Sequence, residues 1–174
     1  MLTVRIRLDS IDCTERAREW CKLPYPDHPK GCPAYGKRVD CPPQAKRFNE
    51  VFEPPFFLVA VRFDLGKHVA EMLKKHLKWT EKQAKCVLYW QKTVEKTLRQ
   101  KCEKLISRLP NGFCYTLKPE AMGVNVFTTA FKHGIPIETR PKQYVWKIAV
   151  VGKLNSSYSF LSSRRGKDAS KLLG

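Results

Sequence analysis

The alternation of apolar and polar positions along the chain predicts the strands of a sheet. In residues 3–8, Val4, Ile6 and Leu8 alternate with polar side chains, which is the period of a strand that buries one face. Residues 56–63 and 144–151 are almost continuously apolar and predict two further, buried strands. The shorter run at residues 113–117 favours one more strand.

Three other segments have the composition of helices. Residues 66–78 and 81–109 are separated by Thr80 and Gln83, which fit the capping box that starts a helix. Pro119 and Gly134 stand at the start and just past the end of the third, residues 120–133. In the segment 81–109 apolar residues recur at three- and four-residue spacing and predict one amphipathic helix: Ala84, Val87, Leu88, Val94, Leu98, Cys102, Leu105 and Leu109.

The segment from residue 22 to residue 55 carries prolines at short intervals, which exclude a long regular element. An irregular stretch of this length needs a metal or a partner to organise it. The order of strands and helices around it predicts an α+β fold in a single domain, residues 1–154, with helices packed on a mixed or antiparallel sheet. Residues 155–174 are Ser-rich and basic and predict a flexible tail.

The chain is strongly basic, with a formal net charge of +17. Such an excess favours polyanionic partners, because neutralising phosphates releases counterions. It predicts RNA, DNA or a nucleoprotein as the partner, and a merely solvated basic surface is the alternative. The residues expected to contact phosphates lie largely outside the apolar stripe or in the tail: Lys82, Lys85, Lys92, Lys96, Arg99, Arg164 and Arg165.

The apolar runs are too short for a membrane protein. None reaches the roughly 18 residues that a membrane-spanning helix needs. The first residues alternate in polarity instead of forming the apolar core of a signal peptide. We therefore expect a cytoplasmic protein without a membrane partner. In that compartment the seven cysteines, an odd number, are expected to be metal ligands or buried thiols rather than disulfides.

Three cysteines crowd into the proline-rich segment. Cys21, Cys32 and Cys41 have the spacing C-x10-C-x8-C, and thiolates on an extended loop can converge on one soft metal centre. Cys32 and Cys41 each precede a proline, as the end of an iron–sulfur ligand run often does. Three thiolates are one short of the usual set of four, so a fourth ligand must come from elsewhere. His28 could replace one ligand, or it is an ordinary histidine of a surface loop.

Two ordered blocks carry a resemblance to a known family. The first, C-P-x-Y-G-x4-C-P-P, stands here as Cys32-Pro-Ala-Tyr-Gly-Lys-Arg-Val-Asp-Cys41-Pro-Pro43, with Cys21 upstream. The second, E-A-M-G-[IV]-[DN]-V-F-x-T, stands as Glu120-Ala-Met-Gly-Val-Asn-Val-Phe-Thr-Thr129. With these blocks the chain resembles a family of uncharacterised metal-binding proteins of archaea and anaerobic bacteria, predicted to be iron–sulfur proteins.

The resemblance implies a ligand set. Family members commonly carry several clustered cysteines just before the second block, and here only Cys114 stands in that place. Cys21, Cys32, Cys41 and Cys114 would then form one four-thiolate site. A single 4Fe–4S cluster is the expected occupant, with zinc in the same thiolates or unligated buried thiols as alternatives.

The function expected from these features is an iron–sulfur protein whose basic surface binds RNA or DNA. A redox or sulfur-transfer enzyme, an electron carrier and a structural zinc protein are the alternatives. The sequence contains no Gly-rich phosphate loop, nucleophile elbow or paired-carboxylate motif that would indicate a reaction. Whether the protein is an enzyme therefore stays open at this point.

Overall fold

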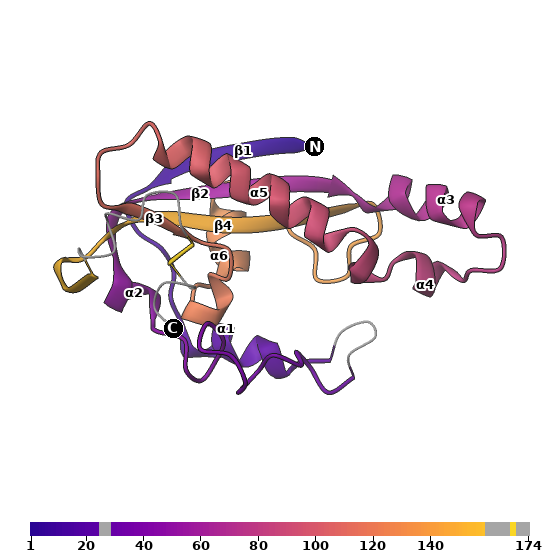
Figure 1. The fold of residues 1–174 in the computed structure, drawn as a ribbon, viewed down its shortest axis with the longest axis horizontal. Coiled ribbons are helices and arrows are strands. Elements are labelled where there is room, and N and C mark those ends of the chain that lie inside the picture. Colours follow the sequence, from indigo (N-terminus) through magenta and orange to yellow (C-terminus); the bar gives the residue numbers. More distant parts are fainter. Residues whose placement is uncertain (25–28, 159–167, 170–174) are drawn as a thin grey trace.

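The computed structural model describes residues 1–24, 29–158 and 168–169, and its centre is an antiparallel sheet of four strands. The strands are β1 (Leu2–Leu8), β2 (Phe52–Asp64), β3 (Phe113–Thr116) and β4 (Tyr144–Leu154), in the order β1-β2-β4-β3 (Figure 1). All the predicted strands are present. The α+β class is confirmed, with a purely antiparallel sheet and helices on both of its faces.

Strand β2 begins earlier than the sequence predicts. The proline-rich segment was expected to stay irregular up to residue 55, but a short helix, α2 (Phe48–Val51), leads directly into β2 at Phe52. Pro54 and Pro55 lie inside the strand, and the pairing with β4 shifts register between Glu53 and Phe57. A proline has no N–H to donate to a ladder, so it is accommodated at such an irregularity.

The predicted helix 81–109 is wrong as one continuous element. After α3 (Leu65–Lys75) come a single turn, α4 (Glu81–Ala84), a 3-10 turn, η2 (Val87–Tyr89), and then α5 (Gln91–Ile106). The break follows from Trp90, whose ring stacks on Phe63 at a centroid distance of 5.0 Å. Its indole N–H donates to the Lys85 carbonyl at 3.2 Å. The capping box at Thr80 and Gln83 is confirmed.

The two faces of the sheet bury separate cores. Val59, Val61 and Val151 face α5, where Leu98 and Cys102 of the predicted stripe are fully buried. Leu58, Ala60 and Val150 face the other way, because successive side chains of a strand point to opposite faces. One stripe residue, Leu88, is 74% exposed, since the helix break turns it away from the sheet.

The second face of the sheet is covered by short helices. These are α1 (Glu15–Glu19), η1 (Trp20–Lys22), η3 (Glu120–Met122) and α6 (Val126–Lys132), which lie on the side of the sheet opposite α5 (Figure 1). The predicted helix 120–133 is thus interrupted. Gly123 adopts a φ of 92°, and Asn125 then caps α6 by accepting a hydrogen bond from the Thr128 N–H at 3.0 Å.

Part of the predicted tail packs on the sheet. Asp168 forms a parallel bridge with Tyr115 of β3, and both Asp168 and Ala169 are buried. Residues 159–167 and 170–174 lie outside the described residues. Within the described ranges, no helix has both the length and the apolar character that crossing a membrane requires.

Candidate functional site

The structure brings Cys21 and Cys32 together through the backbone. The Cys32 N–H donates to the Cys21 carbonyl at 2.7 Å, so the backbones of these two residues are in direct contact. The residue before Cys32 must be a glycine. Gly31 has a φ of 80°, and a Cβ there would lie 2.6 Å from the Cys21 carbonyl oxygen. The backbone contact between Cys21 and Cys32 therefore depends on Gly31.

Turns then carry the chain from Cys32 to Cys41. The Tyr35 N–H donates to the Cys32 carbonyl at 3.1 Å, and the Gly36 N–H donates to the Pro42 carbonyl at 2.8 Å. The second bond closes residues 36–42 into a compact loop that ends at Cys41, which is buried. We call residues 21–45 the cysteine loop.

Burial and neighbouring charges oppose the ionisation of two thiols of the cysteine loop, those of Cys21 and Cys41. Burial, followed by the negative charges of Cys32, Cys41 and Glu120, raises the pKa of Cys21 to about 11, although the charge of Lys118 acts in the opposite direction. Burial also raises the pKa of Cys41, on which the charge of Cys32 acts in the same direction. Thiols whose ionisation is opposed by burial and by a neighbouring thiolate, as for Cys21 and Cys41, are donors that a soft metal cation stabilises.

The thiols do not yet stand at ligating distances. Among the described residues, no three His, Cys, Asp or Glu side chains lie close enough together to hold a metal ion. The thiol donors suit a metal ion or cluster chemically. Binding would require the three sulfur atoms to move closer to one another. His28, the alternative ligand, lies outside the described residues.

Cys114 stands apart from the other three cysteines. It lies on β3 opposite Gly152, fully buried in the core between the sheet and α6. Burial, with a smaller contribution from the charge of Asp168, raises the pKa of its thiol to about 11. The described structure therefore places Cys21, Cys32 and Cys41 in one loop, but it does not bring Cys114 to them.

Two cations around the buried Asp40 carboxylate lie next to Cys41. The Lys118 ammonium lies 2.6 Å from the Asp40 carboxylate and 3.8 Å from the Cys41 sulfur. The Arg38 guanidinium contacts the same carboxylate with two donors, at 3.0 and 3.2 Å. Burial alone would raise the pKa of Asp40, but Lys118 and Arg38 together lower it. Lys118 is thus a cation fixed beside a thiol, where it favours the thiolate.

Arg18 joins the two sequence blocks. Its guanidinium is buried and donates to three backbone carbonyls, those of Pro43 at 2.9 Å, Ala45 at 2.9 Å and Ala121 at 3.1 Å. Pro43 and Ala45 lie two and four residues after Cys41, and Ala121 belongs to the second block. Arg18 therefore fixes the end of the cysteine loop against η3, beside Glu120.

Sequence patterns gave no signal for Arg18 or Lys118 as parts of this site. Glu120 could have been found from the second block, which the structure places near Cys21. Burial raises the pKa of Glu120, and its charge acts on the Cys21 thiol. The two blocks that carry the family resemblance are thus neighbours in space.

The predicted phosphate-contacting residues are distributed over two helices and the tail. Lys82 lies on α4 and Lys85 directly follows that helix, where it pairs with Glu81 at 2.5 Å. Lys92 and Lys96 are exposed on α5. The other members are Arg99 on α5 and the tail residues Arg164 and Arg165, which lie outside the described residues.

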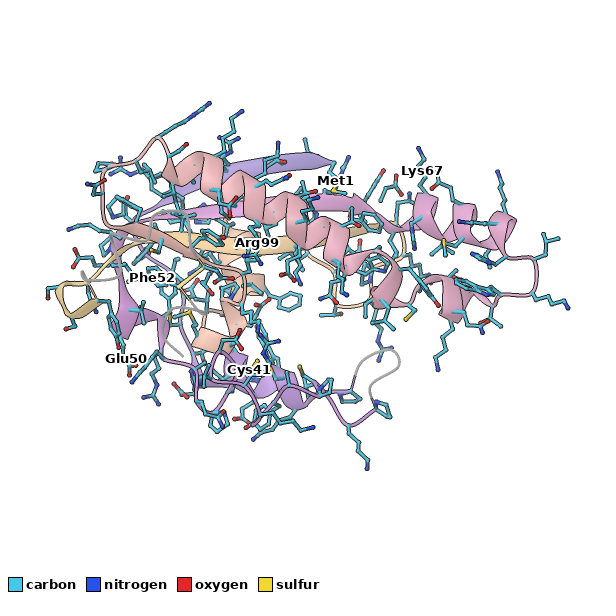
Figure 2. The ribbon with its side chains drawn as sticks, in the orientation of Figure 1. Met1, Cys41, Glu50, Phe52, Lys67 and Arg99 are labelled. Carbon is cyan, nitrogen blue, oxygen red and sulfur yellow. The ribbon has the colours of Figure 1, made fainter. Side chains whose placement is uncertain are left out.

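Arg99 contacts internal partners. Its guanidinium lies 3.2 Å from the Glu95 carboxylate, 3.4 Å from the Tyr115 hydroxyl and 4.0 Å from the buried Asp168 carboxylate. Figure 2 shows Arg99 on α5 and Cys41 in the layer across the sheet, so the basic helix and the cysteine loop are separate regions of the surface.

Comparison with known proteins adds no assignment. No protein-family model matches the chain, and neither a curated protein nor a solved structure is similar to it. The resemblance described from the two sequence blocks therefore stays a prediction.

Proposed function

We propose that the protein binds a metal centre, a 4Fe–4S cluster in the first place, through Cys21, Cys32 and Cys41. The observation that supports this proposal is the glycine-dependent backbone contact between Cys21 and Cys32, together with the charges of Cys32 and Cys41 that act on the Cys21 thiol. Lys118 supports it, because a cation beside Cys41 offsets negative charge that thiolates and a cluster accumulate. Free thiols suit the reducing cytoplasm, where we place the protein.

The fourth ligand decides between two kinds of function. If Cys114 moves to the site, four thiolates favour a structural or electron-transfer role, for iron–sulfur or for zinc. With three cysteines, one metal position lacks a protein thiolate, and an open position favours redox or sulfur-transfer chemistry. The burial of Cys114 in the core supports the second arrangement.

Substitution of single cysteines tests this proposal. We expect Cys21→Ser, Cys32→Ser and Cys41→Ser each to lose most of the bound iron or zinc, because binding at such a site requires every deprotonated ligand. Protein prepared without oxygen is assayed for iron, zinc, acid-labile sulfide and visible absorption. Cys86→Ser, in the partly buried turn before η2, is the control that keeps the metal.

Cys114→Ser separates the two arrangements. Retention of the metal supports three cysteine ligands, and its loss without unfolding supports the four-cysteine set. Wild-type protein that carries no metal when prepared without oxygen contradicts the proposal.

A second function, binding of RNA or DNA, is favoured by the exposed lysines of α5. Lys92 and Lys96 are one helical turn apart, and no described carboxylate forms an ion pair with either. Lysines with this placement attract phosphates without reading sequence. The net charge of +17 acts in the same direction.

The salt dependence of binding tests this second function. We expect the double variant Lys92→Gln, Lys96→Gln to flatten the log–log slope of affinity against salt by roughly 1.4–1.8, because each phosphate contact contributes about 0.7–0.9. Binding of a labelled RNA or DNA is measured at several salt concentrations. The matched control is Lys37→Gln, Lys46→Gln, two exposed lysines across the sheet. An unchanged slope in the α5 variant would indicate a solvated surface without a phosphate-binding role.

A further inference from the structure

The end of α3, α4, η2 and the start of α5 form a basic arm, residues 74–92. Figure 1 shows α3 and α4 side by side beyond the end of the sheet. The arm carries a single carboxylate, Glu81, which pairs with Lys85. No described carboxylate forms an ion pair with Lys74, Lys75 or Lys78. The six lysines of the arm are Lys74, Lys75, Lys78, Lys82, Lys85 and Lys92.

A stack of rings lies among these lysines. The His76 and Trp79 rings are nearly parallel, with a centroid distance of 4.1 Å and an interplanar angle of 13°. Trp79 in turn contacts Tyr89 at 4.9 Å. Trp79 is partly buried against the core, whereas Tyr89 is half exposed. The stack is therefore anchored at its middle and ends in an accessible ring.

Large apolar side chains extend the same surface. Leu77 is 90% exposed in the loop after α3, and Leu88 next to Tyr89 is 74% exposed. Exposed apolar area of this kind, surrounded by charge of one sign, marks an interaction site. The excess of lysine over carboxylate argues against a protein partner, because the cores of protein interfaces are depleted in lysine.

We propose that the arm binds single-stranded nucleic acid, with an unstacked base on Tyr89 at the end of the ring stack and the phosphates on the surrounding lysines. The inference rests on the proposed binding of RNA or DNA and specifies the form that is bound. In a duplex the bases already stack on one another, so only a single strand offers free base faces to an aromatic side chain. A lysine-lined surface with an exposed aromatic ring is the arrangement that such binding uses.

Tyr89→Ala tests the proposal through a comparison of two probes. One is a labelled single-stranded oligonucleotide of about 16 nucleotides, the upper site size of a small binding module. The other is the same sequence as a duplex. We expect Tyr89→Ala to raise the Kd for the single strand by about 5-fold or more, since base stacking is lost. The Kd for the duplex should stay unchanged, and Tyr89→Phe, which keeps the ring, should retain tight binding of the single strand.

Controls separate this inference from the function on which it rests. Phe131→Ala removes an even more exposed aromatic ring (82%, against 50% for Tyr89) on α6, on the opposite face of the sheet, and should alter neither affinity. If the protein binds both probes and Tyr89→Ala weakens neither or both equally, the inference fails while binding of nucleic acid stands. If neither probe binds near physiological salt, the proposed nucleic-acid function and the inference fail together. Circular dichroism shows whether the variants keep their helices.

Discussion

Replacing Arg18 with Ala is expected to reduce the free energy of unfolding by roughly 3–5 kcal/mol. The substitution leaves the carbonyls of Pro43, Ala45 and Ala121 without their donor. Two of these hydrogen bonds are buried, and no water replaces a donor there without cost. Because Pro43 and Ala45 lie two and four residues after Cys41, the variant should also release the end of the cysteine loop.

A neighbour on the same helix is the matched control for this prediction. Arg16 lies two residues away on α1, and its side chain is exposed. We expect Arg16→Ala to change stability by about 0.5 kcal/mol or less, as surface substitutions usually do. Urea denaturation followed by circular dichroism measures both variants. Equal stability of the two would show that the three carbonyl contacts of Arg18 do not hold the loop.

The same variant links the fold to the proposed metal centre. Release of the chain after Cys41 should lower the occupancy of iron or zinc without removing any sulfur ligand. Arg18→Lys keeps the positive charge but lacks the planar fork that reaches three carbonyls. A loss of metal in Arg18→Lys as large as that in Arg18→Ala would therefore indicate that geometry, and not charge, is what Arg18 contributes.

The strands could be predicted from the sequence because their signal is local. Val4, Ile6 and Leu8 alternate on β1, and the continuous apolar runs of β2 and β4 match strands covered on both faces. The helix break before α5 could not be predicted in this way, since Val87 and Leu88 fit the apolar spacing of a helix. The stacking of Trp90 on Phe63, a tertiary contact, decides the break.

The candidate site shows the same division between local and distant information. The spacing of Cys21, Cys32 and Cys41 within one loop predicts a shared site, and the structure shows a backbone contact between Cys21 and Cys32. Lys118 is separated by 78 positions from Asp40, and the contact of Arg18 with Ala121 spans 103 positions. Contacts between residues so far apart in the sequence cannot be predicted from the spacing within a motif. The placement of Cys114 likewise depends on β3, whose register with β4 carries it into the core.

The largest difference expected between two chemically identical substitutions is that between Leu98→Ala and Leu88→Ala. Both leucines belong to the apolar stripe that the sequence predicts. Leu98 lies in the middle of α5 and is fully buried against β2 and β4, so its truncation leaves a cavity in the core. We expect a loss of roughly 2–5 kcal/mol for Leu98→Ala. Leu88 is exposed, and its truncation should cost about 0.5 kcal/mol or less.

Chemical denaturation of the two variants measures this difference, and the denaturant dependence should keep the slope of the wild type. The comparison tests the helix break independently of any ligand. In an uninterrupted helix over residues 81–109, Leu88 would face the sheet as Leu98 does, and both substitutions would be costly. A large loss for Leu88→Ala would therefore contradict the break at residues 85–90. A small loss of stability would agree with the exposure of Leu88 and its neighbour Tyr89 on the surface that we propose for binding of single-stranded nucleic acid.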